Sequence, residues 1–397
     1  MRTTADVVII GGGCMGASVA YHLARRGVTD VVLVEREPLL ATASTGRNAG
    51  GVRHQFSHEA NVRLSIESIH LFEHFEEAVG SPIDFHQDGY LFLLSTEQSV
   101  AQFRAAVAMQ RRLGVEVDWL DADQARDRVP GLDTRGVLAA TFCRRDGIAD
   151  PNGVTMGFAR GAQAAGVDIC RDTEAVAIDV RGGRIAGVET TRGTIDVPIV
   201  VDAAGPWAGR VGALAGIDVP ISPLRRHIFI AQPPGEGGWV RSSADGRTER
   251  VAPDTHVMVI DFETTFYFHR EGANLLFGMG DPHEAFGFDT TVRWDLLADV
   301  VDVAVRRLPI LAETAVSHAW AGLYEMTPDA MPIIGPVAAM PGLFLIAGFS
   351  GHGFQHSPPA GRVLADDIAG ADPRFDLSPF ALERFAGARR AGEGHVV

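Results

Sequence analysis

Three glycines and one glutamate near the start of the chain have the spacing of a dinucleotide-binding site. Gly11, Gly13 and Gly16 form a G-x-G-x-x-G pattern directly after the apolar run Val7–Ile10. The first glycine permits a tight turn, the second lets a pyrophosphate approach the backbone, and the third lets a helix pack against a strand. Glu35 follows the last glycine by 19 residues and offers a carboxylate to a ribose 2′-hydroxyl. The pattern predicts an adenine dinucleotide whose phosphates lie at a helix N-terminus.

The elements around this motif form a β-α-β unit. A strand at 7–10, a helix from about Met15 to Arg26 and a strand at 31–34 follow one another, and both strands are continuous apolar runs. Such runs are typical of parallel strands that are buried on both faces. We therefore expect helices to cover both sides of this sheet.

Some later segments repeat this pattern of an apolar strand followed by a glycine turn, and others do not. Apolar strands at 199–202 and 343–348 each lead into a glycine turn, and the second leads into a helix expected from about Pro359 to Ile368. A longer helix is expected from Glu59 to Val79. Two other stretches contain short strands separated by Pro, Gly and Asp turns, which favours antiparallel sheet. We expect one domain from 1–86, 145–222 and 319–397, and a second from 87–144 and 223–318.

Composition excludes several classes of function. The chain has 35 Lys plus Arg against 50 Asp plus Glu, a net charge of −15, whereas proteins that bind nucleic acid need the opposite sign. No stretch approaches the roughly 20 apolar residues of a membrane span. Cys14, Cys143 and Cys170 form no C-x-x-C pair, and the histidines add no metal-ligand spacing. We expect a cytoplasmic protein with no bound metal, nucleic acid or membrane span.

Three further motifs give the chain its resemblance to a known family. They are STGRNAGG at Ser44–Gly51, VDAAGPW at Val201–Trp207 and AGFSGHGF at Ala347–Phe354. With the N-terminal motif, they resemble the D-amino-acid-oxidase-like FAD oxidoreductases, in the branch of sarcosine oxidases and glycine oxidases. The resemblance covers nearly the whole chain. It implies an α/β fold, in which an FAD-binding Rossmann-like domain of the glutathione-reductase type is interrupted by an antiparallel-sheet substrate domain.

The resemblance also implies which residues surround FAD. Glycines let bare backbone meet the flavin and the pyrophosphate, and a helix N-terminus after Gly351 would stabilise the reduced ring. The cysteine that tethers flavin in monomeric sarcosine oxidases would fall near Gly322, and no cysteine follows Cys170, so FAD is expected to be noncovalent. The expected FAD contacts are Gly11, Gly13, Met15, Gly16, Glu35, Arg36, Thr45, Asn48, Ala49, Gly50, Gly51, Val176, Ala204, Gly205, Trp207, Gly351, His352, Gly353, Phe354 and Gln355.

On the substrate side, the family chemistry moves a hydride from the carbon beside an amine to flavin N5 and leaves an imine. The expected substrate is a secondary or N-methyl amino acid. Arg53 matches an arginine that clamps the substrate carboxylate, because its planar fork pairs with both oxygens. Tyr267 matches a tyrosine that reaches the substrate, and His352 lies beside the expected flavin. The plain alternatives are a structural arginine, a core aromatic and a hydrogen-bonded core histidine.

Some positions depart from the family pattern. Gln355 stands where sarcosine oxidases have a second cation, a lysine, and Tyr324 stands where glycine oxidases have an arginine. The expected carboxylate clamp is therefore thinner than in those enzymes. The lysine that activates oxygen in sarcosine oxidases would fall at 274–277, which reads NLLF. The electron acceptor is accordingly oxygen or another acceptor, including a partner subunit.

Other functions remain open at this point. A 2-hydroxy-acid oxidoreductase would present the same hydride geometry on the same fold. The chain could also be the flavoprotein subunit of a multi-subunit amine dehydrogenase, or a dinucleotide-binding sensor without catalysis. Turnover of a small substrate panel, under oxygen and then with a dye as acceptor, separates these functions.

Overall fold

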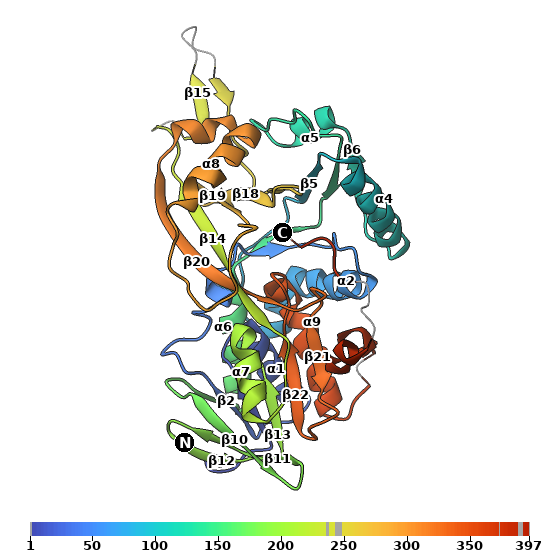
Figure 1. The fold of residues 1–397 in the computed structure, drawn as a ribbon, viewed down its shortest axis with the longest axis vertical. Coiled ribbons are helices and arrows are strands. Elements are labelled where there is room, and N and C mark those ends of the chain that lie inside the picture. Colours follow the sequence, from blue (N-terminus) through green and yellow to red (C-terminus); the bar gives the residue numbers. More distant parts are fainter. Residues whose placement is uncertain (1, 236–237, 243–247, 373, 388–391, 397) are drawn as a thin grey trace.

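The computed structural model describes residues 2–235, 238–242, 248–372, 374–387 and 392–396. A parallel sheet lies in the lower half of Figure 1, and a larger, mostly antiparallel sheet lies in the upper half. Among the described residues, we find no helix with the length and apolar character that crossing a membrane requires. Residues 1 and 397, the first and last residues of the expected FAD-binding domain, lie outside the described residues.

The parallel sheet has six strands in the order β21-β22-β13-β1-β2-β9. All neighbouring pairs are parallel except β21 with β22. Ile10 pairs with both Val34 and Asp202, so the carboxyl ends of the three central strands are level. The strand bounds are Val7–Ile10 (β1), Val31–Val34 (β2), Asp168–Cys170 (β9), Ile199–Asp202 (β13), Ile333–Pro336 (β21) and Leu343–Ala347 (β22).

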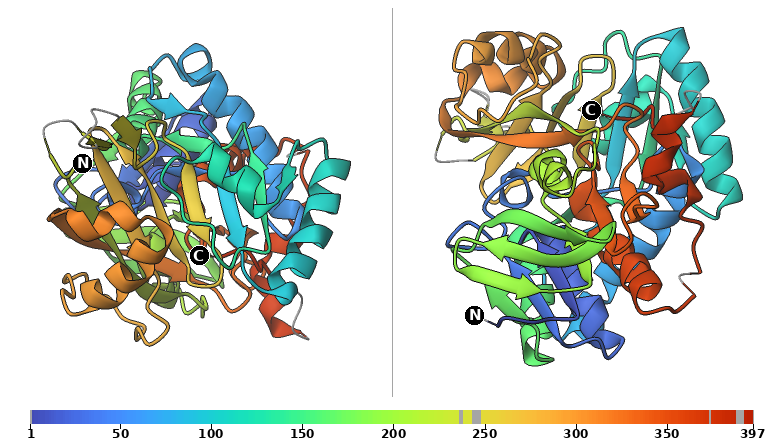
Figure 2. Two further views of the ribbon diagram at one scale, coloured as in Figure 1. Left: turned by 90° about the horizontal axis from the view of Figure 1, so that it is seen from above. Right: turned by 60° about the horizontal axis from the view of Figure 1, so that its bottom comes forward.

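The two faces of this sheet are covered differently. On one face, Val7 and Ile9 pack in a core with the helices α1 (Cys14–Arg25), α6 (Pro151–Ala164) and α9 (Gly353–Ile368). On the other, Val8 and Ile10 pack against a three-stranded antiparallel sheet, β10-β11-β12, with the short helix α7. Figure 2, right, shows these green strands lying across the blue strands. Helices therefore lie on both faces, as expected, but on the second face α7 is short and the antiparallel sheet formed around the hairpin at 181–184 supplies much of the cover. The bounds are Ala175–Arg181 (β10), Arg184–Thr190 (β11), Gly193–Asp196 (β12) and Ala208–Leu214 (α7).

The larger sheet has eight strands in the order β20-β14-β19-β18-β17-β5-β7-β6. Its neighbouring pairs are antiparallel except β17 with β5, which are parallel because they come from distant parts of the chain and no hairpin joins them. The expected domain boundary at 319 falls inside β20, and the domain division stays a prediction. The bounds are Tyr90–Leu94 (β5), Asp118–Leu120 (β6), Ala139–Cys143 (β7), Ser222–Ala231 (β14), Met258–Asp261 (β17), Phe266–Glu271 (β18), Asn274–Met279 (β19) and Val316–Met326 (β20).

The remaining elements lie outside these three sheets. The helix expected from Glu59 to Val79 is divided at His74, whose backbone (φ −120°, ψ 23°) is not helical. The remaining strands are Gly51–Val52 (β3), Phe85–His86 (β4), Gly147–Ala149 (β8), Val240–Ser242 (β15) and Thr248–Arg250 (β16). The remaining α-helices are Glu59–Glu73 (α2), Phe75–Val79 (α3), Glu97–Arg112 (α4), Ala122–Arg128 (α5) and Leu296–Arg307 (α8). Short 3₁₀ turns lie at Thr45–Arg47, Gly205–Trp207, Pro309–Glu313, Ser378–Phe380 and Leu382–Ala386.

The last long helix begins six residues earlier than expected. Helix α9 (Gly353–Ile368) contains two consecutive prolines, which have no N–H to donate to the carbonyls four residues before them. Those carbonyls belong to Phe354 and Gln355. The hydroxyl of Ser357 donates to the first at 2.8 Å, and the hydroxyl of Ser68 donates to the second. The helix continues through the prolines because side chains replace the missing donors.

Candidate functional site

A cavity of about 550 Å³ lies where the carboxyl ends of the parallel strands meet the larger sheet. It brings together most of the expected site residues. Both Arg53 and Tyr267 line it, whereas Gly16 and Gly50 do not. The expected FAD contacts that line it are Gly11, Gly13, Met15, Glu35, Arg36, Thr45, Asn48, Ala49, Gly51, Val176, Ala204, Gly205, Trp207, Gly351, His352, Gly353, Phe354 and Gln355.

The N-terminus of α1 forms one end of the cavity. No acidic residue lies in its first turn, its N-cap Gly13 has no side chain, and the backbone N–H of Cys14 donates to the hydroxyl of Thr45 at 3.1 Å. A Cβ on Gly11 (φ +115°) would lie 2.5 Å from the carbonyl oxygen of Ala203. A Cβ on Gly16 would lie 1.9 Å from the carbonyl oxygen of Gly11, so this glycine serves the packing of helix on strand. The positive end of the helix dipole and the bare backbone suit a phosphate.

The carboxylate of Glu35 is held in place at the end of β2. It accepts hydrogen bonds from the backbone N–H of Gly12 at 2.6 Å and of Glu37 at 2.9 Å. Beside it, the guanidinium of Arg36 lies 4.2 Å from the centre of the Trp207 ring, and the two side chains form a wall. This end of the cavity therefore presents an oriented carboxylate and a flat cationic wall.

The N-terminus of α9 faces the same cavity from another side. Its N-cap is His352, and no acidic residue lies in its first turn. The imidazole of His352 is buried, which lowers its pKa to about 4 and keeps the ring neutral. Its Nε2 lies 3.2 Å from the carbonyl oxygen of Ala330, and its Nδ1 lies 3.3 Å from Nδ1 of His356. Both ring nitrogens are thus engaged by protein groups.

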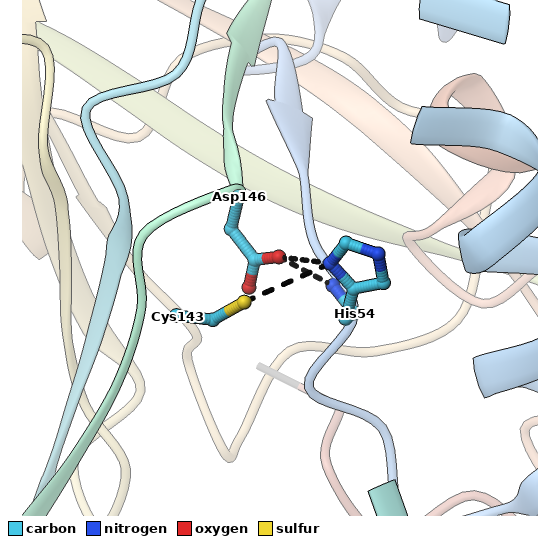
Figure 3. A group of neighbouring side chains, drawn as sticks. All are labelled: His54, Cys143 and Asp146. Carbon is cyan, nitrogen blue, oxygen red and sulfur yellow. Dashed lines mark hydrogen bonds and ion pairs between the residues drawn. The ribbon is translucent and has the colours of Figure 1, made fainter. Parts of the chain in front are cut away.

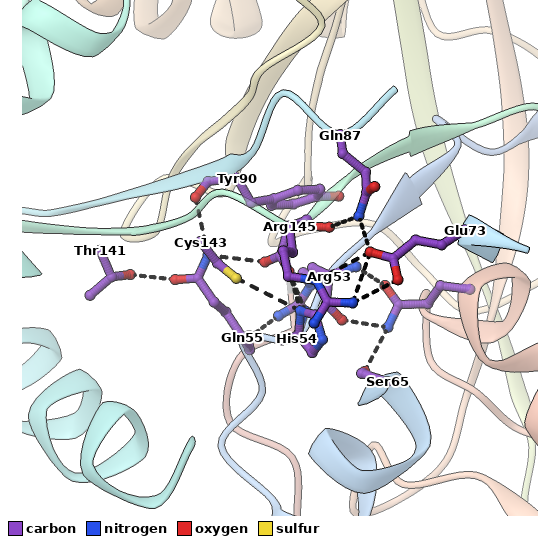
Figure 4. Close-up of polar contacts among 12 residues, drawn as sticks. Arg53, His54, Gln55, Ser65, Glu73, Gln87, Tyr90, Thr141, Cys143 and Arg145 are labelled. Carbon is purple, nitrogen blue, oxygen red and sulfur yellow. Dashed lines mark hydrogen bonds and ion pairs between the residues drawn. The ribbon is translucent and has the colours of Figure 1, made fainter. Parts of the chain in front are cut away.

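Arg53 is buried beside the cavity and is held by backbone carbonyls. Its Nη1 donates to Gln55, its Nη2 donates to the carbonyl of His395 at 2.6 Å, and its guanidinium lies 3.9 Å from the centre of the Phe56 ring. Its backbone N–H donates to Gln355 at 2.9 Å. Burial lowers the pKa of Arg53, and the charges of Glu393 and Asp146 act in the opposite direction, although no carboxylate of the described residues forms an ion pair with its guanidinium. Figure 4 shows the group of polar contacts around it.

His54 lies outside the cavity wall and forms part of a buried polar cluster (Figure 3). Its Nδ1 lies 2.6 Å from Asp146, which also accepts from the backbone N–H of His54 at 2.9 Å and from Gln55 at 3.2 Å. The thiol of Cys143 lies 3.7 Å from the same ring nitrogen, and burial raises its pKa. The cluster ties the segment that carries Arg53 to the loop after β7.

Three of the four tyrosines in the chain line this cavity. Burial raises the pKa of each, so all three hydroxyls are neutral and able to donate. Each ring occupies the space that a Cβ would need on a glycine of another segment. The pairs are Tyr90 with Gly51, Tyr267 with Gly278 and Tyr324 with Gly351.

Arg226 is the cavity residue that the sequence did not single out. Its neighbour Arg225 forms ion pairs with Glu284 and Asp289, but the guanidinium of Arg226 lies 5.1 Å from the centre of the Tyr324 ring. Its Nε and Nη1 are buried and have no hydrogen-bond partner among the described residues. Successive side chains on a strand point to opposite faces, so the Arg225-Arg226 pair in β14 was the available signal.

Two carboxyl groups with raised pKa values lie in or beside the site, and only Glu325 lines the cavity. Glu325 lines the cavity and accepts from the backbone N–H of Phe349 at 3.3 Å, and burial raises its pKa to about 7. Asp202 ends β13 and accepts from the backbone N–H of Ala204 at 3.1 Å, and burial raises its pKa to about 8. The sequence motif contains Asp202, but its burial was not foreseen.

Comparison with known proteins decides which dinucleotide this architecture holds. The family model "FAD dependent oxidoreductase" matches residues 6–367. The chain belongs to this family. The predicted family, the fold class and FAD as the cofactor are therefore confirmed.

Relatives of this FAD-dependent oxidoreductase span several enzymes. Mitochondrial dimethylglycine dehydrogenase of Rattus norvegicus is 30% identical over 403 residues, which cover 97% of this chain and 45% of that protein. FAD-dependent oxidoreductase domain-containing protein 1 of Xenopus laevis is 31% identical, covering 96% and 82%. The chain thus spans less than half of the dimethylglycine dehydrogenase. The solved L-proline dehydrogenase from P. horikoshii is 31% identical with a TM-score of 0.87, covering 97% of this chain and 99% of that chain.

The residues present fit FAD. Two helix N-termini without acidic side chains, those of α1 and α9, border one cavity, and they suit the anionic parts of the cofactor. The carboxylate of Glu35 and the wall of Arg36 and Trp207 lie at the end where the adenosine would bind. A Cβ on Gly322 would lie 3.1 Å from the Cβ of Arg47, so a larger side chain there has little room.

Proposed function

We propose that this FAD-dependent oxidoreductase oxidises the carbon-nitrogen bond of a secondary or N-methyl amino acid. The observation that carries the proposal is the side chain of Arg226, which lines the cavity and whose buried Nε and Nη1 have no acceptor in the described structure. A buried charged donor without an acceptor is costly, and a substrate carboxylate would supply the acceptor. The names of relatives support the amine: dimethylglycine, sarcosine and L-proline dehydrogenases.

The protein groups at this end of the cavity have separable roles. FAD, when bound, accepts two electrons and a proton from the substrate as a hydride. Arg226 and Arg53 would both pair with the carboxylate, and the neutral hydroxyls of Tyr267 and Tyr324 would donate to it or to the amine. Two guanidinium groups, those of Arg53 and Arg226, disfavour a further positive charge nearby. The substrate amine is therefore held in its neutral form, which can release a hydride.

We further propose that oxygen is not the main electron acceptor. All 35 cationic side chains of the sequence are arginines, and no lysine is present. The position expected for an oxygen-activating lysine lies in β19, where Leu275 and Leu276 are buried. Relatives named dehydrogenases agree with another acceptor, such as a partner protein.

Anaerobic mixing of the holoenzyme with candidate substrates tests the function. The panel contains sarcosine, N,N-dimethylglycine, L-proline, glycine and the 2-hydroxy acids glycolate and lactate. We expect the flavin absorbance near 450 nm to bleach with a secondary or tertiary amino acid and to stay with the hydroxy acids. Bleaching by hydroxy acids alone would replace the proposal with the 2-hydroxy-acid alternative, and bleaching by none would refute both.

A further inference from the structure

A segment near the chain end, Gly392–Val396, enters the substrate end of the cavity. Val396 lines the cavity itself. One residue before it, the carbonyl of His395 accepts the hydrogen bond from Nη2 of Arg53 at 2.6 Å. A Cβ on Gly392 would lie 1.9 Å from the carbonyl oxygen of Asp329, so the segment packs tightly where it begins.

The carboxylate of Glu393 anchors the segment. This side chain is buried, and five donors surround its two oxygens. Burial alone would raise its pKa, but the nearby His395 and the hydrogen bonds outweigh that effect and lower the pKa to about 2. It also lies at the N-terminus of α2, where the helix dipole favours an anion. The donors are the backbone N–H and hydroxyl of Ser57, the backbone N–H groups of His58 and His395, and Nδ2 of Asn61, at 2.6 to 3.1 Å.

The ring of His395 provides a second anchor. It is fully buried and stacks on Phe103 of α4, with centroids 3.9 Å apart and planes at 11°. Phe262 meets it edge-on at 5.8 Å, and Phe92 lies 6.4 Å away. Burial lowers the pKa of this histidine to about 4, so the ring is a neutral aromatic plate at neutral pH. Its contribution here is packing, while its backbone carbonyl reaches Arg53.

These contacts fix the guanidinium of Arg53 from two sides. Nη1 is held by the carbonyl of Gln55 and Nη2 by that of His395, while the ring of Phe56 covers one face. Two of its five N–H donors are used in this way. The two carbonyls belong to Gln55 and His395, which lie 340 residues apart in the sequence. Without the segment, one edge of the guanidinium would lose its fixed partner.

We infer that Gly392–Val396 is part of the substrate pocket and that Glu393 is a positioning residue: it holds the backbone carbonyl of His395 in place, and that carbonyl orients Arg53 for binding of the substrate carboxylate. The inference rests on the proposed function and states that the segment Gly392–Val396 holds the guanidinium of Arg53 in place. The effect passes through the carbonyl of His395 and the carboxylate of Glu393. Neither residue is required to touch the substrate.

Titration of the FAD holoenzyme with pyrrole-2-carboxylate tests the inference. This planar carboxylate resembles L-proline but has no hydrogen to give up as a hydride, and its binding is read from the flavin difference spectrum. In Glu393→Gln, an amide N–H₂ replaces one acceptor among five donors, so the segment should leave its place. We expect the dissociation constant to rise about tenfold or more while flavin content stays unchanged. The exposed Glu116→Gln variant is the matched control and should bind as the wild type.

Two further variants separate positioning from simple loss of structure. In His395→Phe the stacked ring and the backbone carbonyl are kept, so binding should stay within about twofold of the wild type. In an Arg53→Met background, Glu393→Gln should have no further effect, because the group that it orients is gone. The inference is overturned if Glu393→Gln binds normally, if it weakens the Arg53→Met enzyme by the same factor, or if His395→Phe abolishes binding.

The same titration keeps the two proposals distinguishable. The proposed function is refuted, and the positioning role of Glu393 is supported, if the wild type binds pyrrole-2-carboxylate, Glu393→Gln weakens that binding, and no amino acid reduces the flavin. A wild type that is reduced by L-proline or sarcosine, with Glu393→Gln equal to it in the apparent dissociation constant, keeps the function and refutes the role. A wild type that does not bind the carboxylate at millimolar concentration also refutes it.

Discussion

Replacement of Arg226 by methionine should lower the catalytic efficiency of the enzyme without lowering its thermal stability. Methionine keeps much of the side-chain length and the contact with the Tyr324 ring but removes the charge. In the free enzyme, Nε and Nη1 of Arg226 are buried without acceptors, so the wild type carries the cost of an unsatisfied charged group. We therefore expect the substrate-free variant to have an equal or higher melting temperature.

The catalytic loss can be worked from the same atoms. Truncation of one partner of a buried, hydrogen-bonded charge pair costs about 2 to 5 kcal/mol. At 1.4 kcal/mol for each factor of ten, the rate of anaerobic flavin reduction divided by the apparent dissociation constant should fall about 30-fold to 4,000-fold. The exposed Arg104→Met variant, which also loses one charge, should show neither change. A lower melting temperature for Arg226→Met with unchanged reduction kinetics would make Arg226 structural and refute the reasoning.

Three other predictions concern the cofactor, the acceptor and pH. FAD should be released into the supernatant on acid precipitation, and Glu35→Ala should raise the dissociation constant for FAD at least tenfold in ultrafiltration assays; flavin that stays with the pellet contradicts the first. Stopped-flow reoxidation of the photoreduced enzyme by oxygen should be slow, with a dye competing well; fast peroxide formation with no gain from the dye contradicts this. The pKa of Asp202 is raised to about 8 from 3.8, so its stabilising protonated form is lost as pH rises. In chemical denaturation, the stability of Asp202→Asn relative to the wild type should therefore increase between about pH 4 and pH 8, and a constant difference would show that the folded Asp202 is not protonated.

The nucleotide side of the site was accessible from sequence because its information is local. The turn from Gly11 to Gly16 and the carboxylate of Glu35 lie within one β-α-β unit, where each residue type has a direct backbone or ribose role. The exceptions are informative. Gly16 packs against Gly11, and Gly50 (φ +73°) has its Cβ direction blocked by Ala149, so both shape the backbone without lining the cavity.

The substrate side was less accessible because its contacts join distant segments. The end of the chain had given no functional signal, yet His395 reaches Arg53 across 342 residues. The start of α9 was misplaced because the hydroxyl that supports its prolines belongs to Ser68, 287 residues from its acceptor. Arg226 looked like one of two equivalent arginines. Only the fold shows that Arg225 has acidic partners and that its neighbour faces the cavity.

The pairs of tyrosine and glycine give the pocket an adjustable width. A Cβ at Gly51 would lie 1.9 Å from the hydroxyl of Tyr90, so an alanine there must displace the side chain of Tyr90, which lines the cavity. Tyr90→Phe would free the space of about one oxygen atom. The double variant Gly51→Ala/Tyr90→Phe would therefore restore the original width of the pocket. The hydroxyl of Tyr267 meets Gly278 in the same way, whereas Tyr324 meets Gly351 with the carbon atoms of its ring. Each of the three tyrosines that line the cavity is therefore backed by a glycine of another segment, and a side chain at that glycine would shift the tyrosine and change the shape of the cavity.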